Sequence, residues 1–202
     1  MAIINAMVRV LSSLGVHPNI LTTIGVTINV MCGVLFGLGE FFWAGVVLIL
    51  ANLFDMLDGN VARLSGNTSR FGSFLDSTLD RVSDMVCFIG IIVFYARDVP
   101  QHSTLNVFLA GLGLLGSIMV SYSTAKSEGF GIKSNVGFLQ RPERIVLFII
   151  GGLSTWNWES THFLANRMTQ VLWVLAIGSM WTFIQRMLYT WVEMKRTEEV
   201  KI

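Results

Sequence analysis

The sequence predicts an all-α membrane protein, in which six transmembrane helices form a bundle and an N-terminal amphipathic helix lies in the membrane interface. Hydrophobic residues make up 53% of the 202 residues and charged residues only 13%, against about 25% charged in an ordinary soluble domain. Apolar segments recur at about the 20-residue length that a bilayer-spanning helix needs. The Lys and Arg residues, finally, gather on one side of the expected membrane.

The apolar segments give the expected helices, at residues 20–38, 42–62, 72–96, 105–126, 145–157 and 168–190. The fifth is the shortest. The connections between them are short, and no internal repeat or linker rich in proline, glycine or serine interrupts the chain. We therefore expect residues 1–202 to form a single domain.

The first residues predict the interfacial helix and the orientation. Residues 1–16 alternate apolar residues with polar ones such as Asn5 and Arg9, whereas a cleaved signal peptide needs a compact apolar core. An N-terminus in the cytoplasm and six crossings put every Lys and Arg except Arg97 and Arg167 on the cytoplasmic side. This basic rim suits anionic headgroups or phosphorylated substrates and is not typical of nucleic-acid binding. We expect a multi-pass protein of a prokaryotic-type inner membrane, with its active site facing the cytoplasm.

Five aspartates lie inside the second and third predicted helices: Asp55, Asp58, Asp76, Asp80 and Asp84. A carboxylate at membrane depth is costly, so such residues usually face a cavity and have a function. Successive residues of a helix turn by about 100°. Asp55 and Asp58 therefore share one face of their helix, and Asp76 and Asp80 share one face of theirs.

Four carboxylates brought together by these two faces indicate a metal site. Their repulsion would drive protonation unless cations occupied the gap, and four negative charges match two divalent ions. Because all donors are oxygens, the site favours Mg²⁺ or Mn²⁺. The predicted metal ligands are Asp55, Asp58, Asp76 and Asp80. Intramembrane carboxylates also build cation pathways, so an intramembrane cation transporter is the alternative from another class.

Residues 55–80 read D-M-L-D-G-N-V-A-R, eight further residues, then G-S-F-L-D-S-T-L-D. This resembles the complete signature of the CDP-alcohol phosphotransferases, D-x-x-D-G-x-x-A-R-x8-G-x-x-x-D-x-x-x-D. The resemblance implies a homodimeric membrane enzyme of phospholipid biosynthesis. Such an enzyme transfers a phosphatidyl group from CDP-diacylglycerol, or an ether-lipid analogue, to a small alcohol and releases CMP. The matching glycines, Ala62 and Arg63 disfavour a cation pathway, which has no need of an arginine beside it.

The resemblance also implies a role for each motif residue. Asp55 and Asp76 would bridge two metal ions, and Asp58 would bind the first ion. Asp80 would bind the second ion and act as the general base. The implied CDP-lipid contacts are Pro18, Asn19, Ile20, Leu21, Gly59, Ala62, Arg63 and Ser69. Asp84 lies outside the signature, and we expect a structural role for it, either beside the metal ligands or paired with Arg81 or Arg63.

Acceptor specificity is predicted by two segments outside the motif: 121–128 reads S-Y-S-T-A-K-S-E, and 141–144 reads R-P-E-R. They resemble the family branch that makes phosphatidylinositol phosphate, in which the segments read S-Y-x-K-A-R-A-E and R-P-E-R. This implies that Lys126, Arg141 and Arg144 hold the phosphate of an acceptor such as inositol 1-phosphate. Thr124 replaces a lysine of the branch, and Lys126 replaces an arginine and loses its fork of donors. Glycerol 3-phosphate or another alcohol is therefore the alternative acceptor.

Overall fold

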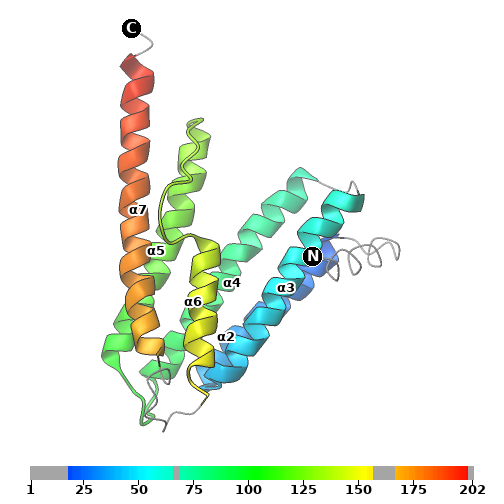
Figure 1. Cartoon of the computed structure of the whole chain (residues 1–202), viewed down its shortest axis with the longest axis vertical. Helices are drawn as coiled ribbons and strands as arrows, with labels where there is room; N and C mark the ends of the chain where they lie inside the picture. The colour runs from blue at the N-terminus through cyan, green and yellow to red at the C-terminus, as the bar shows by residue number, and fades with distance from the viewer. Residues whose placement is uncertain (1–17, 66–68, 157–166, 200–202) are drawn as a thin grey trace.

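The computed structural model describes residues 18–65, 69–156 and 167–199, without the side chains of 18, 19, 21, 56–65 and 198. The described residues form six helices and no strand (Figure 1). The helices are α2 (Pro18–Leu38), α3 (Phe41–Ser65), α4 (Arg70–Ala96), α5 (Thr104–Gly129), α6 (Arg141–Leu153) and α7 (Met168–Glu199). The predicted all-α class is confirmed, whereas the interfacial helix expected at 1–16 lies outside the described residues.

Helix α6 is displaced at both ends relative to the sequence prediction. It was expected at 145–157 but runs from Arg141 to Leu153. Pro142 lies in its first turn, where a missing backbone N–H costs nothing because that group has no partner inside a helix. The polar residues 141–144 therefore belong to the helix although they interrupt the apolar pattern. With 13 residues, α6 is shorter than the roughly 20 that cross a bilayer.

Two of the described helices are long and apolar enough to cross a membrane, at Thr104–Gly129 and Met168–Thr197. Shorter apolar stretches occupy Thr22–Leu38 and Phe41–Asp55. The second of these ends at Asp55, the last residue of α3 whose side chain is described. The six crossings remain a prediction.

Successive helices run in alternating directions through the bundle (Figure 1). Helix α2 packs against α3 and α4, α5 packs against α4 and α7, and α6 packs against α3 and α7. In Figure 1, α5 and α7 lie together on one side, α2 and α3 on the other, and α6 between them. This order brings side chains of α3, α4 and α6 to a common interior region.

Two glycine contacts allow the backbones of these helices to approach closely. A Cβ atom added to Gly90 of α4 would overlap the carbonyl oxygen of Gly33 on α2. A Cβ atom on Gly152 of α6 would lie 2.8 Å from the carbonyl oxygen of Phe41 at the start of α3. Small residues permit such close packing between membrane helices. These contacts position the helices that carry the aspartates and Arg141.

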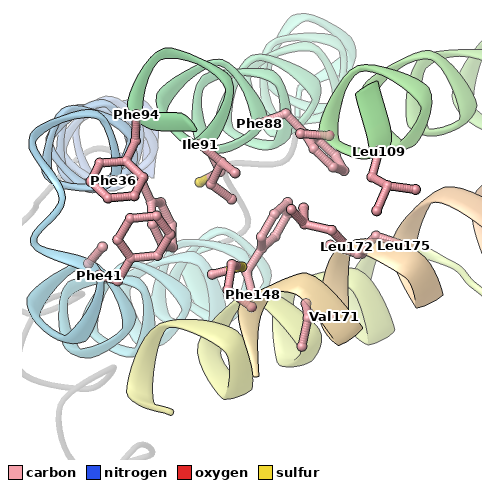
Figure 2. Packing of buried hydrophobic residues seen from close by; sticks show 14 of the residues in the cluster. Phe36, Phe41, Phe88, Ile91, Phe94, Leu109, Phe148, Val171, Leu172 and Leu175 are labelled. Carbon is pink, nitrogen blue, oxygen red and sulfur yellow. The ribbon is translucent and has the colours of Figure 1, made fainter. Parts of the chain in front are cut away.

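A cluster of buried aromatic rings fills the interior (Figure 2). Phe88 of α4 meets Phe148 of α6 edge to face, with ring centroids 4.8 Å apart and an angle of 74° between the rings. Such pairs add about 0.5–1.5 kcal/mol beyond the burial of their surface. Asp84 lies one turn before Phe88, and Arg144 lies one turn before Phe148. The aromatic contact therefore sets the spacing at which the polar side chains of α4 and α6 meet.

The segment 130–140, between α5 and α6, folds back onto α7. The Leu139 backbone N–H donates to the Thr182 hydroxyl at 3.0 Å, and Arg186 Nε donates to the Val136 carbonyl at 2.8 Å. Gly137 has a φ of +122° and lies against Thr182, a conformation that favours glycine. These contacts bring the start of α6 beside α4, where the candidate site lies.

Candidate active site

Three of the four predicted metal ligands come together between α3 and α4. Asp55, Asp76 and Asp80 each offer one carboxylate oxygen, and the three atoms lie within 4.8 Å of one another. All three side chains are half-buried. Asp58 follows Asp55 by one turn of α3, but its side chain lies outside the described residues. The described part of the predicted ligand set is thus suited to a divalent cation, since hard ions favour carboxylate oxygens.

Arg141, the first residue of α6, reaches into this carboxylate cluster. Its Nη2 lies 2.7 Å from Asp80 Oδ1 and its Nη1 lies 3.3 Å from Asp55 Oδ2. Arg141 lies before residues 145–157, the fifth membrane span that the sequence predicts. Burial acts to lower the pKa of its guanidinium, but the carboxylates of Asp80, Asp55 and Asp84 outweigh burial and raise that pKa above the usual value. Arg141 therefore links α3 to α4 and offsets part of the negative charge of the cluster.

Arg144 has a different environment, because its guanidinium is 2% exposed and paired with Asp84. Its Nε and Nη2 donate to Asp84 Oδ2 at 3.2 Å and 2.6 Å, and its Nη1 donates to the Leu139 carbonyl at 3.5 Å. The Ser117 hydroxyl donates to the same aspartate oxygen at 3.3 Å. Asp84 therefore forms its short ion pair with Arg144, and Arg141 Nε lies 3.9 Å from its other carboxylate oxygen. Arg81, which the sequence suggested, donates to the Ser77 carbonyl instead.

A cavity of about 260 Å³ opens beside Asp80. Four arginines line it, together with polar and acidic side chains from α4, α5 and the segment before α6: Arg81, Arg141, Arg144, Arg186, Ser77, Asp80, Asp84, Ser121, Thr124, Asn135 and Gln140. Asp80 thus belongs to both the carboxylate cluster and the cavity. The arginine side chains that line the cavity make it suitable for a phosphorylated ligand.

Arg186 of α7 is a cavity residue that the sequence reasoning placed only among the cytoplasmic cations. It is 6% exposed. Its Nε donates to the Val136 carbonyl, and its Nη1 donates to the Val120 carbonyl at 3.1 Å and to the Thr124 hydroxyl. The available signal was an arginine inside the predicted span 168–190, because a charged residue at membrane depth usually faces a cavity.

Lys126, by contrast, does not lie with Arg141 and Arg144. Thr124 of α5 faces the cavity, and two residues further along a helix correspond to a rotation of about 200°. Lys126 accordingly lines an apolar groove on the other side of α5, with its Nζ 5.6 Å from the centre of the Phe130 ring. The structure therefore brings together two of the three basic residues predicted to bind the acceptor phosphate.

The predicted CDP-lipid residues are described in part. Ser69 is the N-cap of α4, and its hydroxyl accepts a hydrogen bond from the Gly72 backbone N–H at 2.9 Å. Ile20, in the first turn of α2, is exposed. The remaining predicted contacts lie in α2 and α3, but their side chains are outside the described residues: Pro18, Asn19, Leu21, Gly59, Ala62 and Arg63.

Among curated proteins, the chain is similar to several phosphatidylinositol phosphate synthases. It is 35% identical over 188 residues to that of Mycobacterium tuberculosis, covering 91% of this chain and 83% of the relative. It is 37% identical over 181 residues to that of Streptomyces avermitilis, covering 85% and 71%.

Solved structures of the Mycobacterium tuberculosis phosphatidylinositol phosphate synthase are also similar to this chain. The form with CDP-DAG bound matches with a TM-score of 0.84 and 32% identity, covering 95% of this chain and 94% of that one. The complex with manganese and citrate matches with a TM-score of 0.82 and 32% identity, covering 93% and 88%. The family model for CDP-alcohol phosphatidyltransferase matches residues 15–193. The chain therefore belongs to the CDP-alcohol phosphatidyltransferase family, a class of phospholipid-biosynthetic enzymes, as the motif at 55–80 implied.

Proposed function

We propose that the protein transfers a phosphatidyl group from CDP-diacylglycerol, or an ether-lipid analogue, to the hydroxyl of a small phosphorylated alcohol and releases CMP. The observation that carries this proposal is the position of Asp80. It contacts Arg141 and belongs both to the carboxylate cluster and to the arginine-lined cavity. One side chain therefore connects a region suited to a metal-bound pyrophosphate with a region suited to an acceptor phosphate.

The proposed cofactor is a pair of divalent ions, Mg²⁺ or Mn²⁺, held by Asp55, Asp58, Asp76 and Asp80. The convergence of three of these carboxylates supports this assignment, and the similar structure with manganese is consistent with it. The ions would neutralise the pyrophosphate oxygens and stabilise the departing CMP.

Asp80 is the proposed general base. The acceptor oxygen forms a bond to the phosphorus that carries the diacylglycerol, and the bond from that phosphorus to the oxygen of CMP breaks. The hydroxyl proton passes to an Asp80 carboxylate oxygen, because a neutral hydroxyl is a poor nucleophile without a base within hydrogen-bond reach. Arg141 Nη2 already lies 2.7 Å from Asp80 Oδ1 and holds this carboxylate in place for the transfer.

We assign the CDP-lipid to the motif end of α3 and α4 and to the start of α2. The contacts proposed from the family resemblance are Pro18, Asn19, Ile20, Leu21, Gly59, Ala62, Arg63 and Ser69. The similarity to a structure with CDP-DAG bound supports this assignment. The described cap at Ser69 leaves its hydroxyl oxygen exposed at the start of α4, where a helix N-terminus favours anionic groups.

We propose that Arg141 and Arg186 bind the acceptor phosphate. Arg144 does not bind it but is held in place by its ion pair with Asp84. Lys126 faces away from the cavity, so it has no part in this assignment. The preferred acceptor is inositol 1-phosphate, because the similar curated proteins are phosphatidylinositol phosphate synthases. Thr124 lacks the charge of the lysine found in that branch but bonds to Arg186. Glycerol 3-phosphate remains the second candidate.

The proposed setting is a homodimeric, multi-pass protein of a prokaryotic-type inner membrane. Its single domain of six transmembrane helices and an N-terminal interfacial helix opens its site to the cytoplasm. The two long apolar helices and the basic residues at the cytoplasmic ends support this topology. A cation transporter is disfavoured because the Arg141 guanidinium contacts Asp55 and Asp80, which places a fixed positive charge in the path of any cation.

The test incubates purified protein in detergent with CDP-diacylglycerol and Mg²⁺ or Mn²⁺ and measures CMP release. The acceptors are inositol 1-phosphate, glycerol 3-phosphate and unphosphorylated inositol, and the Asp80→Asn variant is the inactive control. We expect release with a phosphorylated acceptor and none with inositol. No release with any acceptor, together with cation flux in liposomes, would overturn the enzyme assignment for the transporter.

A further inference from the structure

A second large hollow lies between α5 and α7, on the opposite side of this helix pair from the aspartates. It is a groove of about 480 Å³. Val120 and Thr124 of α5 and Arg186 of α7 line the cavity beside Asp80, whereas the groove is lined by neighbouring residues such as Lys126 and Met187. The two hollows thus share two helices but face in different directions, and the groove is separate from the proposed reaction.

The interior of the groove is suited to a hydrocarbon chain. Its walls include Met119, Met187 and Phe183, and methionine side chains adapt to irregular apolar ligands. Three of the hydroxyls that line it already have partners: Ser127 Oγ and Thr190 Oγ1 lie 2.8 Å apart, and Ser123 donates to the Val120 carbonyl at 3.0 Å. The groove therefore offers a ligand apolar surface, and these hydroxyls do not require a polar occupant.

The rim of the groove is cationic. Lys126 lies near the Phe130 ring, and Lys195 has its Nζ 4.2 Å from the centre of the Trp191 ring. Phe130 and Trp191 both line the groove, so both ammonium groups lie at its edge. Among the described carboxylates, none forms an ion pair with either lysine. An amphipathic occupant would therefore bring a negative charge to this end of the groove.

We propose that this groove binds an anionic phospholipid of the cytoplasmic leaflet, with one acyl chain between α5 and α7 and its phosphate at Lys126 and Lys195. The charge of the rim decides between the possible occupants: a neutral lipid or an apolar helix from a second copy would leave both lysines without a counter-charge. Trp191 is 56% exposed and directly follows the predicted span 168–190, at the position where tryptophan marks the membrane–water interface. The proposal rests on the proposed membrane embedding and orientation, but not on the transfer reaction.

Trp191 provides a direct measurement, because brominated acyl chains quench the fluorescence of a tryptophan that they contact. The protein is placed in nanodiscs of phosphatidylcholine without CDP-lipid, and brominated phosphatidylglycerol or brominated phosphatidylcholine is titrated in. The signal of Trp191 is the difference between the native protein and the Trp191→Phe variant. We expect phosphatidylglycerol to quench this signal at a concentration at least about fivefold lower than phosphatidylcholine, since one basic residue near an anionic lipid is worth about that factor.

The variants Lys126→Gln and Lys195→Gln should each reduce this preference by about fivefold. Lys133→Gln is the matched control, since Lys133 is exposed in the segment 130–140 and does not line the groove. Equal quenching by the two lipids, or an unchanged preference in Lys126→Gln, would overturn the proposal. The proposal would also be overturned if neither lipid quenched Trp191 and the Met187→Cys variant formed a disulfide-linked dimer. That result would assign the groove to a second copy of the chain.

CMP release by the same variants separates this proposal from the proposed function. A protein with the lipid preference but without CMP release contradicts only the transfer reaction. A protein that releases CMP but shows no lipid preference contradicts only the lipid site.

Discussion

Arg144 donates two hydrogen bonds to a single carboxylate oxygen of Asp84, from Nε at 3.2 Å and from Nη2 at 2.6 Å. Both side chains are buried, at 2% and 5% exposure. The pair lies one helical turn from the residues proposed to act in catalysis, because Asp84 follows Asp80 and Arg144 follows Arg141. It joins α4 to α6 beside the cavity and thereby fixes the position of Arg141 at the start of α6.

The first prediction concerns the stability of this pair. Asp84→Asn should lower the free energy of unfolding by about 3–5 kcal/mol, because it leaves a buried guanidinium without a counter-charge. The double variant Asp84→Leu with Arg144→Met should recover most of that loss, since neither charge then remains buried. Thermal unfolding in detergent measures both. An Asp84→Asn protein as stable as the native one would show that the pair contributes nothing to the fold.

The second prediction concerns the proposed base. Asp80→Asn should decrease the rate of CMP release by about 10²–10⁴-fold, the usual contribution of general base catalysis, while binding of CDP-diacylglycerol is largely retained. The control is Asp98→Asn, an exposed carboxylate after the end of α4. Single-turnover CMP release and lipid binding are measured in parallel. A near-normal rate in Asp80→Asn would reject this residue as the base.

The third prediction concerns acceptor binding. Arg186→Gln should raise KM for the phosphorylated acceptor by about 10–100-fold, the value of a hydrogen bond to a charged group, with a smaller effect on kcat. Thr124→Val should shift KM in the same direction by less, because it removes only one contact of Arg186. Arg196→Gln, an exposed arginine near the end of α7, should be neutral. A fall in kcat at unchanged KM would contradict this role for Arg186.

The fourth prediction concerns the metal. Chelation should abolish CMP release, and Mg²⁺ or Mn²⁺ should restore it. An ion that binds the folded protein but not the unfolded chain raises the apparent stability of the protein. Either ion should therefore also raise the unfolding temperature of the native protein. In Asp76→Asn a higher ion concentration should be needed for both effects. If Asp76→Asn shows the native dependence on ion concentration, Asp76 is not a ligand.

The boundaries of the helices show what an apolar pattern can predict. The pattern located both ends of α2, α4 and α5 to within three residues. It misplaced α6 by four residues at each end, since Arg141, Pro142 and Glu143 interrupt the apolar run although they form its first turn. Hydropathy measures the environment of side chains and not the conformation of the backbone, so polar helix ends escape it.

The site shows a comparable limit. The spacing of Asp76 and Asp80 predicted a shared helix face, and their convergence with Asp55 agrees with it. The resemblance of segments 121–128 and 141–144 to the branch that makes phosphatidylinositol phosphate grouped Lys126 with Arg141 and Arg144. Which of them reach the cavity depends on the rotation of α5 and on the contact between segment 130–140 and α7, and neither can be read from local spacing.

The sequence by itself determined that the chain is helical, that it belongs to the CDP-alcohol phosphatidyltransferase family, and that its aspartates recur on shared helix faces. Composition and the repeat of a single helix suffice for the first and third of these properties, and the motif at 55–80 carries the second. Tertiary structure alone decided that Arg141 contacts Asp55 and Asp80, that Arg144 is neutralised by Asp84, and that Arg186 faces the cavity. The ion pairs among those contacts join residues 60 to 86 positions apart, and their geometry follows from how whole helices pack.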